Sequence, residues 1–98
     1  NDGSIHDLPY DSVVEIPVYI QKDRFHKYSI GNLPMEVRGL IQGVKVYERL
    51  TIEAAMEGSY KKALLAISQH PLVSSLSLAE KLLNRLIEVN RELFPELR

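Results

Sequence analysis

The amino-acid sequence predicts an α+β fold in which a short edge hairpin packs on a long helix and two further helices. Three observations lead to this class. β-Branched residues alternate with other residues early in the chain, three stretches of helical periodicity follow, and glycine, proline and serine mark the boundaries between them. The chain has 98 residues, of which 45% are hydrophobic and 26% charged, and this predicts a single small domain spanning residues 1–98.

The first regular element is expected at residues 13–20. Four aliphatic side chains share one face at a period of two, which is typical of a strand: Val14, Ile16, Val18 and Ile20. Pro17 cannot donate a hydrogen bond to a neighbouring strand, so this is an edge strand or a strand bulged at that position. A polar reversal at residues 22–24 then allows residues 25–30 to return as a shorter strand. Because an isolated hairpin is marginally stable in water, we expect it to pack on the helices.

Two helices are expected directly after the hairpin. Pro34 suits the first turn of a helix, and apolar residues at three- and four-residue steps extend this helix to about Glu57. Gly58 and Ser59 are typical of a helix end and of a new N-cap. A second helix is therefore expected from Ser59 to a point just before Pro71.

A third helix is expected near the C-terminus. Ser77 and Glu80 have the spacing of a capping box, and a stripe of leucines follows them to an end near Phe94. Within the first helix, Gly39 and Gly43 are expected to permit the close approach of a neighbouring element, because small residues in helices usually serve packing.

Composition excludes several classes of function. Twelve basic and 13 acidic residues give a net charge of −1, which argues against a nucleic-acid binder held by phosphate neutralisation. The absence of cysteine excludes disulfides, thiolate nucleophiles and zinc-ribbon sites. No apolar run approaches the ~18 residues of a membrane span, and the polar start lacks the apolar region of a signal peptide. A cytoplasmic location is expected.

No motif sufficient for catalysis is present. Three histidines lack the spacing of a metal-ligand pair: His6, His26 and His70. His6 lies in a purely acidic opening segment, so a cation site and a solvated polar loop are both open there; the acidic residues are Asp2, Asp7, Asp11 and Glu15. Glu15 follows two valines, which allows either a half-buried carboxylate with a raised pKa or a side chain on the solvent face.

The first helix carries more apolar surface than one hairpin can cover. We expect this surface to form a packing face for contacts between domains or between subunits of a homo-oligomer. Its residues are Leu40, Ile41, Val44, Tyr47 and Leu50.

Four stretches of the sequence resemble glycoside hydrolase family 4, in the same order. The first is Asn-Asp-Gly-Ser-Ile at 1–5 with Leu-Pro at 8–9 and Val-Val-Glu-Ile-Pro at 13–17. The others are Ile-Gly-Asn-Leu-Pro at 30–34 running to Val-Arg-Gly-Leu at 37–40, Tyr-Glu-Arg-Leu-Thr-Ile-Glu-Ala-Ala at 47–55, and Lys-Ala-Leu-Leu-Ala at 62–66 with His-Pro-Leu-Val at 70–73. The chain resembles the C-terminal portion of that family, and within it most resembles the bacterial 6-phospho-β-glucosidases.

This resemblance implies a fold similar to the lactate and malate dehydrogenases, with an N-terminal Rossmann domain that is absent from this chain. It implies NAD- and Mn2+-dependent hydrolysis of phosphorylated β-glucosides, such as phosphorylated cellobiose, by oxidation at C3, elimination, addition of water and reduction. The nucleotide loop, the Cys and His metal ligands and the catalytic Tyr of the family belong upstream of Asn1. We therefore expect a C-terminal fragment of a longer enzyme that is inactive alone and contains no catalytic, cofactor-binding or metal-binding residue.

Asn1 and Gly3 match the Asn-x-Gly turn of the family, which lies near the substrate. The resemblance thus implies that they form the rim of the substrate cleft, and the alternative is a turn that only leads into the following strand. Two alternatives to a 6-phospho-β-glucosidase are also open. One is another family 4 glycosidase, such as an α-glucosidase, α-galactosidase or galacturonidase, and the other is a non-enzymatic helical interaction module.

Overall fold

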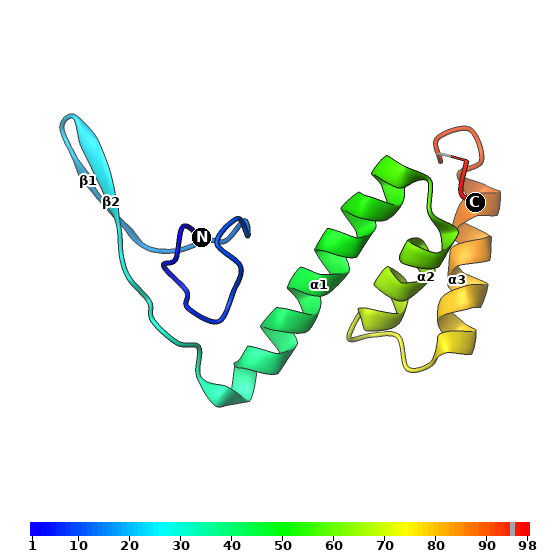
Figure 1. Ribbon diagram of the computed structural model, residues 1–98, viewed down its shortest axis with the longest axis horizontal. Coiled ribbons are helices and arrows are strands. Elements are labelled where there is room, and N and C mark those ends of the chain that lie inside the picture. The colour runs from blue at the N-terminus through cyan, green and yellow to red at the C-terminus, as the bar shows by residue number, and fades with distance from the viewer. Residues whose placement is uncertain (95) are drawn as a thin grey trace. The chain divides into compact units, whose positions relative to one another are not determined.

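The computed structural model describes residues 1–94 and 96–98, which form two strands and three helices in the order β1, β2, α1, α2, α3 (Figure 1). The predicted α+β architecture of a hairpin followed by three helices is confirmed. The chain divides into two compact units, residues 1–42 and 43–98. Helix α1 (Met35–Glu57) begins in the first unit and continues in the second. Within the described ranges, no helix combines the length and the apolar character needed to cross a membrane.

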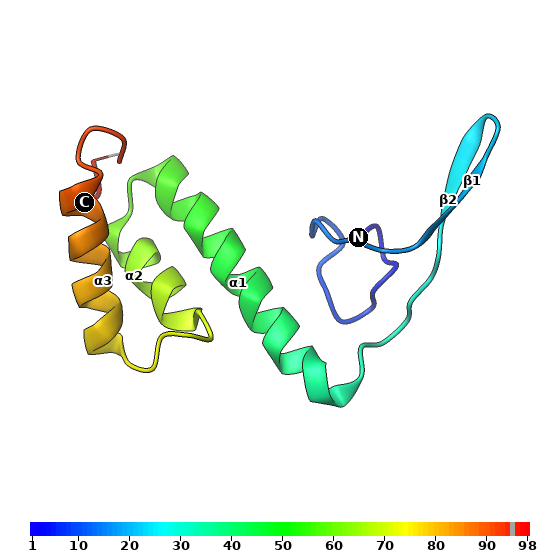
Figure 2. The same cartoon turned by 180° about the vertical axis from the view of Figure 1, so that it is seen from behind.

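The hairpin is shorter than the sequence predicts. Strands β1 (Val18–Gln21) and β2 (Arg24–Lys27) pair antiparallel (Figure 2). Residues 13–17 are not part of the strand, although the carbonyl of Pro17 accepts a hydrogen bond from the N–H of Tyr28 at 3.1 Å. The ladder ends at Pro17 because a proline has no N–H with which to continue it. All eight strand residues are exposed, so the strands themselves do not make the expected packing on a helix.

The core of the first unit lies between the N-terminal loop and the start of α1. Its buried side chains are Ile5, Leu8 and Leu33. Half-buried side chains from the segment before β1 and from α1 pack against it: Val14, Ile16 and Ile41. The apolar face predicted for residues 13–20 is therefore buried in its first half only, since Ile20 is 74% exposed. Contact with the helix is made by the segment that precedes the hairpin.

The boundaries between α1 and α2 follow the local signals. The carbonyl of Pro34 accepts the N–H groups of Val37 and Arg38, which starts α1 as predicted. After α1, Gly58 has a φ of +65°, the left-handed conformation that ends many helices. Helix α2 (Tyr60–Gln69) follows, and the hydroxyl of its N-cap Ser59 accepts a hydrogen bond from an N–H in the first turn, at Lys62.

The predicted start of the third helix was wrong by two residues. Helix α3 (Leu76–Val89) is capped by Ser75, whose hydroxyl accepts the N–H of Leu78 at 3.2 Å. Ser75 has the extended backbone of an N-cap, with a φ of −158°. Ser77 is consequently a helical residue, and the capping box with Glu80 does not form.

The end of α3 also differs from the prediction of an end near Phe94. Asn90 caps the helix, because its backbone N–H and its side-chain Nδ2 both donate to the carbonyl of Leu86, at 3.1 and 2.9 Å. An asparagine can satisfy a terminal carbonyl in this way while leaving helical geometry.

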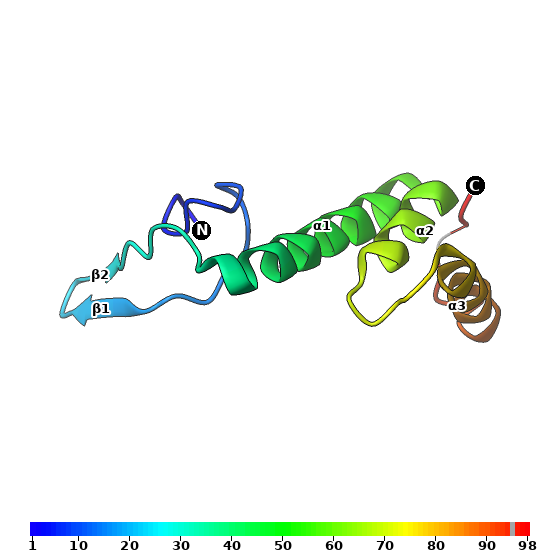
Figure 3. The same cartoon turned by 90° about the horizontal axis from the view of Figure 1, so that it is seen from below.

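The three helical segments of the second unit pack through small side chains. Four of its described residues are buried: Ala54 of α1, Ala66 of α2, and Ala79 and Leu83 of α3. Helices α2 and α3 lie side by side (Figure 3). No described element of this chain packs closely on Gly39 or Gly43, because a Cβ at either position would meet nothing within 4 Å. The expected packing role of these glycines therefore stays a prediction for contacts outside this chain.

Polar contacts join α1 to α2 in this unit. The ammonium of Lys62 lies 2.6 Å from a carboxylate oxygen of Glu53 and 2.7 Å from one of Glu57. These hydrogen bonds raise the pKa of Lys62, and the same ammonium lowers the pKa of Glu53. The rings of Tyr47 and His70 also meet edge to face, with centroids 4.9 Å apart.

Candidate functional site

The N-terminal loop begins with a tight turn at the residues that match the Asn-x-Gly motif. The N–H of Ser4 donates to the carbonyl of Asn1 at 2.9 Å, and both central residues have positive φ, +47° at Asp2 and +80° at Gly3. This is a type I′ turn, in which asparagine, aspartate and glycine are favoured because they tolerate the left-handed region. The turn thus requires the residue types that stand there.

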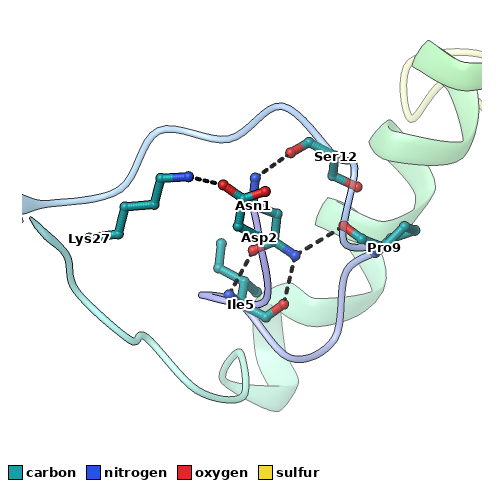
Figure 4. A network of polar contacts seen from close by, with 6 residues as sticks. All are labelled: Asn1, Asp2, Ile5, Pro9, Ser12 and Lys27. Atoms are coloured by element: carbon teal, nitrogen blue, oxygen red, sulfur yellow. Dashed lines mark hydrogen bonds and ion pairs between the residues drawn. The ribbon is translucent and has the colours of Figure 1, made fainter.

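The side chain of Asn1 closes the loop (Figure 4). Its Nδ2 lies within 3.0 Å of the carbonyl oxygens of Ile5, Leu8 and Pro9, and its Oδ1 accepts the N–H of Ile5 at 2.8 Å. The backbone nitrogen of Asn1 donates to the carbonyl of Ser12 at 2.6 Å. Since both polar atoms of this side chain bind the loop itself, the side chain shapes the loop and has no polar atom left over for a ligand.

An ion pair joins the same turn to the hairpin. The ammonium of Lys27 at the end of β2 contacts the carboxylate of Asp2, as Figure 4 shows. The hydrogen bond from Lys27 holds the pKa of Asp2 below its ordinary value. Both side chains are solvent-exposed, so the pair orients the turn more than it stabilises the fold.

Asp7 connects the loop to the start of α1. One carboxylate oxygen accepts the N–H of Leu33 at 2.5 Å, and the other accepts the side-chain amide of Asn32 at 3.1 Å and lies 3.3 Å from Nε of Arg38. The bond from Leu33 is the main reason why the pKa of Asp7 is lowered. The Asp7 carbonyl also accepts Nε2 of Gln42 at 2.9 Å. Four polar contacts thus converge on one residue, which the sequence marks only as an acidic loop residue.

The cation-site alternative for His6 gains no support. Asp2 and Asp7 of the acidic segment are engaged with Lys27 and Arg38, and His6 is exposed. Among residues 1–94 and 96–98, no three His, Cys, Asp or Glu side chains come together as they would around a metal ion. His6 is thus a solvent-exposed side chain on a loop whose aliphatic residues Ile5 and Leu8 are buried.

Among the remaining polar candidates, Glu15 lies where its solvent-facing alternative places it. Glu15 is exposed, which excludes the half-buried carboxylate. His26 lies on the exposed strand β2, and His70 caps the C-terminus of α2, where its Nδ1 accepts the N–H of Leu72 at 3.2 Å.

The residues of the predicted packing face differ in exposure. Leu40 is 56% exposed, whereas Ile41 packs on the core of the first unit. The other three are half-buried within the second unit: Val44, Tyr47 and Leu50. Leu40 is thus the member of the face with the most apolar surface open to a partner.

Comparison with known proteins gives a consistent family. Residues 1–73 match the family 4 glycosyl hydrolase C-terminal domain. The chain is 46% identical over 92 residues to the 6-phospho-β-glucosidase BglT of Thermotoga maritima, which covers 94% of this chain and 22% of that protein. The chain therefore spans about a fifth of the length of this curated relative.

Two solved structures also match along the whole chain. One is a 6-phospho-α-glucosidase from gut microorganisms in complex with NAD and glucose-6-phosphate, at a TM-score of 0.90 and 39% identity, covering 100% of this chain and 22% of that one. The other is the 6-phospho-β-glucosidase of Thermotoga maritima with manganese, NAD+ and glucose-6-phosphate, at a TM-score of 0.82 and 44% identity, covering 100% and 24%.

Proposed function

The chain belongs to family 4 of the glycosyl hydrolases, whose C-terminal domain it matches, and on this basis we propose that it is the C-terminal part of an NAD- and Mn2+-dependent 6-phospho-β-glucosidase. The observation that carries the choice of substrate is the 46% identity to the 6-phospho-β-glucosidase of Thermotoga maritima. The proposed substrates are phosphorylated β-glucosides. Phosphorylation of such sugars during uptake would fit a cytoplasmic enzyme.

A second candidate is a 6-phospho-α-glucosidase. It is favoured by the solved α-glucosidase structure, which matches this chain at a TM-score of 0.90 and 39% identity. The two candidates share the phosphorylated glucose and differ in the anomeric bond that is cleaved. An α-galactosidase or a galacturonidase of the same family has no comparable support among these relatives.

We propose that this chain forms part of the wall of the substrate cleft and of a packing surface, and that it supplies no group that reacts with the substrate. The Asn1–Gly3 turn would lie at the rim of the substrate cleft, with Asn1 as a positioning residue that fixes the loop through its contacts to Ile5, Leu8 and Pro9. The packing face on α1 would contact the rest of the enzyme or a second subunit in a homo-oligomer. Leu40 supports this role, because an exposed leucine in a helix favours a covering partner.

The described residues of this chain do not offer a ligand set for Mn2+. The sequence has no cysteine, and the described side chains offer no set of three metal ligands. We therefore assign no catalytic step to this chain. The cofactors are proposed to bind a Rossmann domain in the remaining four fifths of an enzyme of the relatives' length.

The test is an assay of the full-length enzyme that contains this chain. Nitrophenyl 6-phospho-β-glucoside and its α-anomer would be supplied with NAD+ and Mn2+ together, with each alone, and with a chelator. We expect release of nitrophenol from the β-substrate only when both are present. Faster turnover of the α-substrate would contradict the proposal and support the 6-phospho-α-glucosidase. If neither substrate were hydrolysed, both glucosidase candidates would be rejected, and the non-enzymatic helical interaction module would be the remaining alternative.

The proposed rim is tested in the same enzyme by Asn1→Ala. Because Asn1 holds the loop and provides no free polar group, we expect KM to rise by about tenfold through loss of positioning. Asn84→Ala is the matched control, since Asn84 is an exposed asparagine whose Oδ1 accepts a hydrogen bond from the hydroxyl of Tyr60 at 3.0 Å. Equal KM values for the two variants would contradict the proposed position of Asn1 and Gly3 at the rim of the substrate cleft.

A further inference from the structure

The C-terminal residues 96–98 lie against the turn between α1 and α2. The N–H of Arg98 donates to the carbonyl of Gly58 at 2.7 Å, and the N–H of Tyr60 donates to the carbonyl of Arg98 at 3.0 Å. One residue therefore makes both a donated and an accepted backbone hydrogen bond to the turn, as a residue added to a strand does. The contact also satisfies the N–H of the first residue of α2, which has no partner inside its own helix.

Gly58 makes this contact possible in two ways. Its φ of +65° is a conformation that side-chain-bearing residues rarely adopt. In addition, a Cβ at this position would lie 2.8 Å from the carbonyl oxygen of Glu96, which is too close for any real contact. The turn is thus shaped to admit the backbone of residues 96–98.

Leu97, at the centre of this segment, lines an apolar groove of about 320 Å3 in the second unit. The side chains around the groove come from all three helices and are mostly small or apolar; those of α1 and α2 are Tyr47, Thr51, Ala54, Ala55, Ala63 and Ile67. Leu83 and Leu86 of α3 complete the wall together with Leu93 and Phe94. Leu97 is half-buried, so part of its apolar surface is removed from water by the groove.

We propose that residues 96–98 form a strap that closes this groove reversibly. Among the described residues, two backbone hydrogen bonds and the side chain of Leu97 attach the strap to the helical unit. The ion pair between Arg98 and Glu96 lies within the strap and makes no contact with the helices. Segments with so few contacts open more readily than a packed helix. Opening would uncover the groove while α2 and α3 stay folded.

Amide hydrogen exchange on the 98-residue chain tests the strap. In Gly58→Ala the added Cβ meets the Glu96 carbonyl, so we expect the amides of Arg98 and Tyr60 to exchange at least roughly tenfold faster than in the wild type. Gly43→Ala is the matched control, because a Cβ there meets nothing within 4 Å. The amide of Leu83 in α3 should exchange at the wild-type rate in both variants.

A second measurement reports on the groove itself. Leu97→Ala keeps the backbone contacts but removes the strap's side chain from the lining of the groove, so binding of the apolar dye ANS should rise by several-fold. Leu72→Ala, which shortens a leucine that does not line the groove, should leave dye binding unchanged.

Three results would overturn the proposal. Wild-type exchange of the Arg98 amide at the unprotected rate would mean that the strap is not closed at rest. Equal Arg98 protection in Gly58→Ala and Gly43→Ala would mean that the turn does not control it. Acceleration at Leu83 equal to that at Arg98 would mean that residues 96–98 are an integral part of the helical fold and not a separate strap.

Discussion

The carboxylate of Asp7 accepts a hydrogen bond from the backbone N–H of Leu33 at 2.5 Å across 26 positions of sequence. The same carboxylate is only 11% exposed and lies beside the guanidinium of Arg38. The N-terminal loop and the start of α1 are therefore tied together by an acceptor that works best when it is ionised. If the carboxylate lost its charge, its hydrogen bond from Leu33 and its ion pair with Arg38 would both weaken.

Stability should fall at acid pH through Asp7. Because the pKa of Asp7 is lower in the folded chain, its contribution is present above the unfolded pKa, near 4, and is lost as the pH falls through the lower folded value. Asp7→Asn removes the charge at every pH. We expect this variant to have a lower urea midpoint than the wild type at pH 7, and the difference to shrink between pH 4 and pH 2. Parallel curves over this range would contradict the role of Asp7.

Asn1→Ala should destabilise the N-terminal loop. The substitution removes three part-buried hydrogen bonds, to the carbonyls of Ile5 and Leu8 and from the N–H of Ile5, together with an exposed one to the carbonyl of Pro9. At about 1 kcal/mol for each part-buried hydrogen bond lost, we expect a cost of about 3 kcal/mol in the free energy of unfolding. Urea titration at neutral pH measures it, with Asn84→Ala as the exposed control, for which about 0.5 kcal/mol or less is expected. A similar cost for both variants would show that the loop does not depend on Asn1.

Two serines at the start of α3 should respond differently to alanine. Ser75 is the N-cap and accepts the N–H of Leu78, so Ser75→Ala should cost about 1 kcal/mol. Ser77 lies inside the helix, where alanine is the better helix former, so Ser77→Ala should be neutral or slightly stabilising. Thermal melts of the two variants side by side decide the matter. A larger loss of stability in Ser77→Ala than in Ser75→Ala would instead support the capping box of Ser77 and Glu80 that the sequence predicts.

Adjacent leucines of α3 should also differ. Leu83 is 1% exposed and Leu82 is 39% exposed. Truncating the buried side chain leaves a cavity, so Leu83→Ala should cost about 3 kcal/mol, against about 1 kcal/mol or less for Leu82→Ala. Urea midpoints of both variants test this, and a reversed order would mean that α3 presents its other face to α2.

Local signals in the sequence were sufficient for most of the fold. Pro34, Gly58 and Ser59 each act within one turn of a helix, and the structure uses all three as predicted. The start of α3 failed because Ser75 and Ser77 both offer a capping hydroxyl, and only the backbone conformation, extended at Ser75, selects between them.

Long-range contacts were beyond the reach of such signals. Asp7 contacts Leu33 and Arg38 because the fold of the intervening chain brings them together. No spacing or periodicity in the sequence relates these three positions. The resemblance carried by residues 1–17 and 47–55 gave the family correctly, as the match of residues 1–73 confirms. It could not separate β- from α-glucosidases, because relatives of both kinds share this part of the chain.

The exposed hairpin has a consequence for how the chain behaves in concentrated solution. Among the described residues, strands β1 and β2 pair with each other and with no further strand, so each has an outer side whose backbone groups could join a strand of another molecule and start aggregation. The positive charges of Lys22 and Arg24 at the turn of the hairpin oppose this by repulsion between molecules. Salt shortens the range of that repulsion to about 3 Å at 1 M. Ionic strength should therefore set the concentration at which the chain stays dispersed.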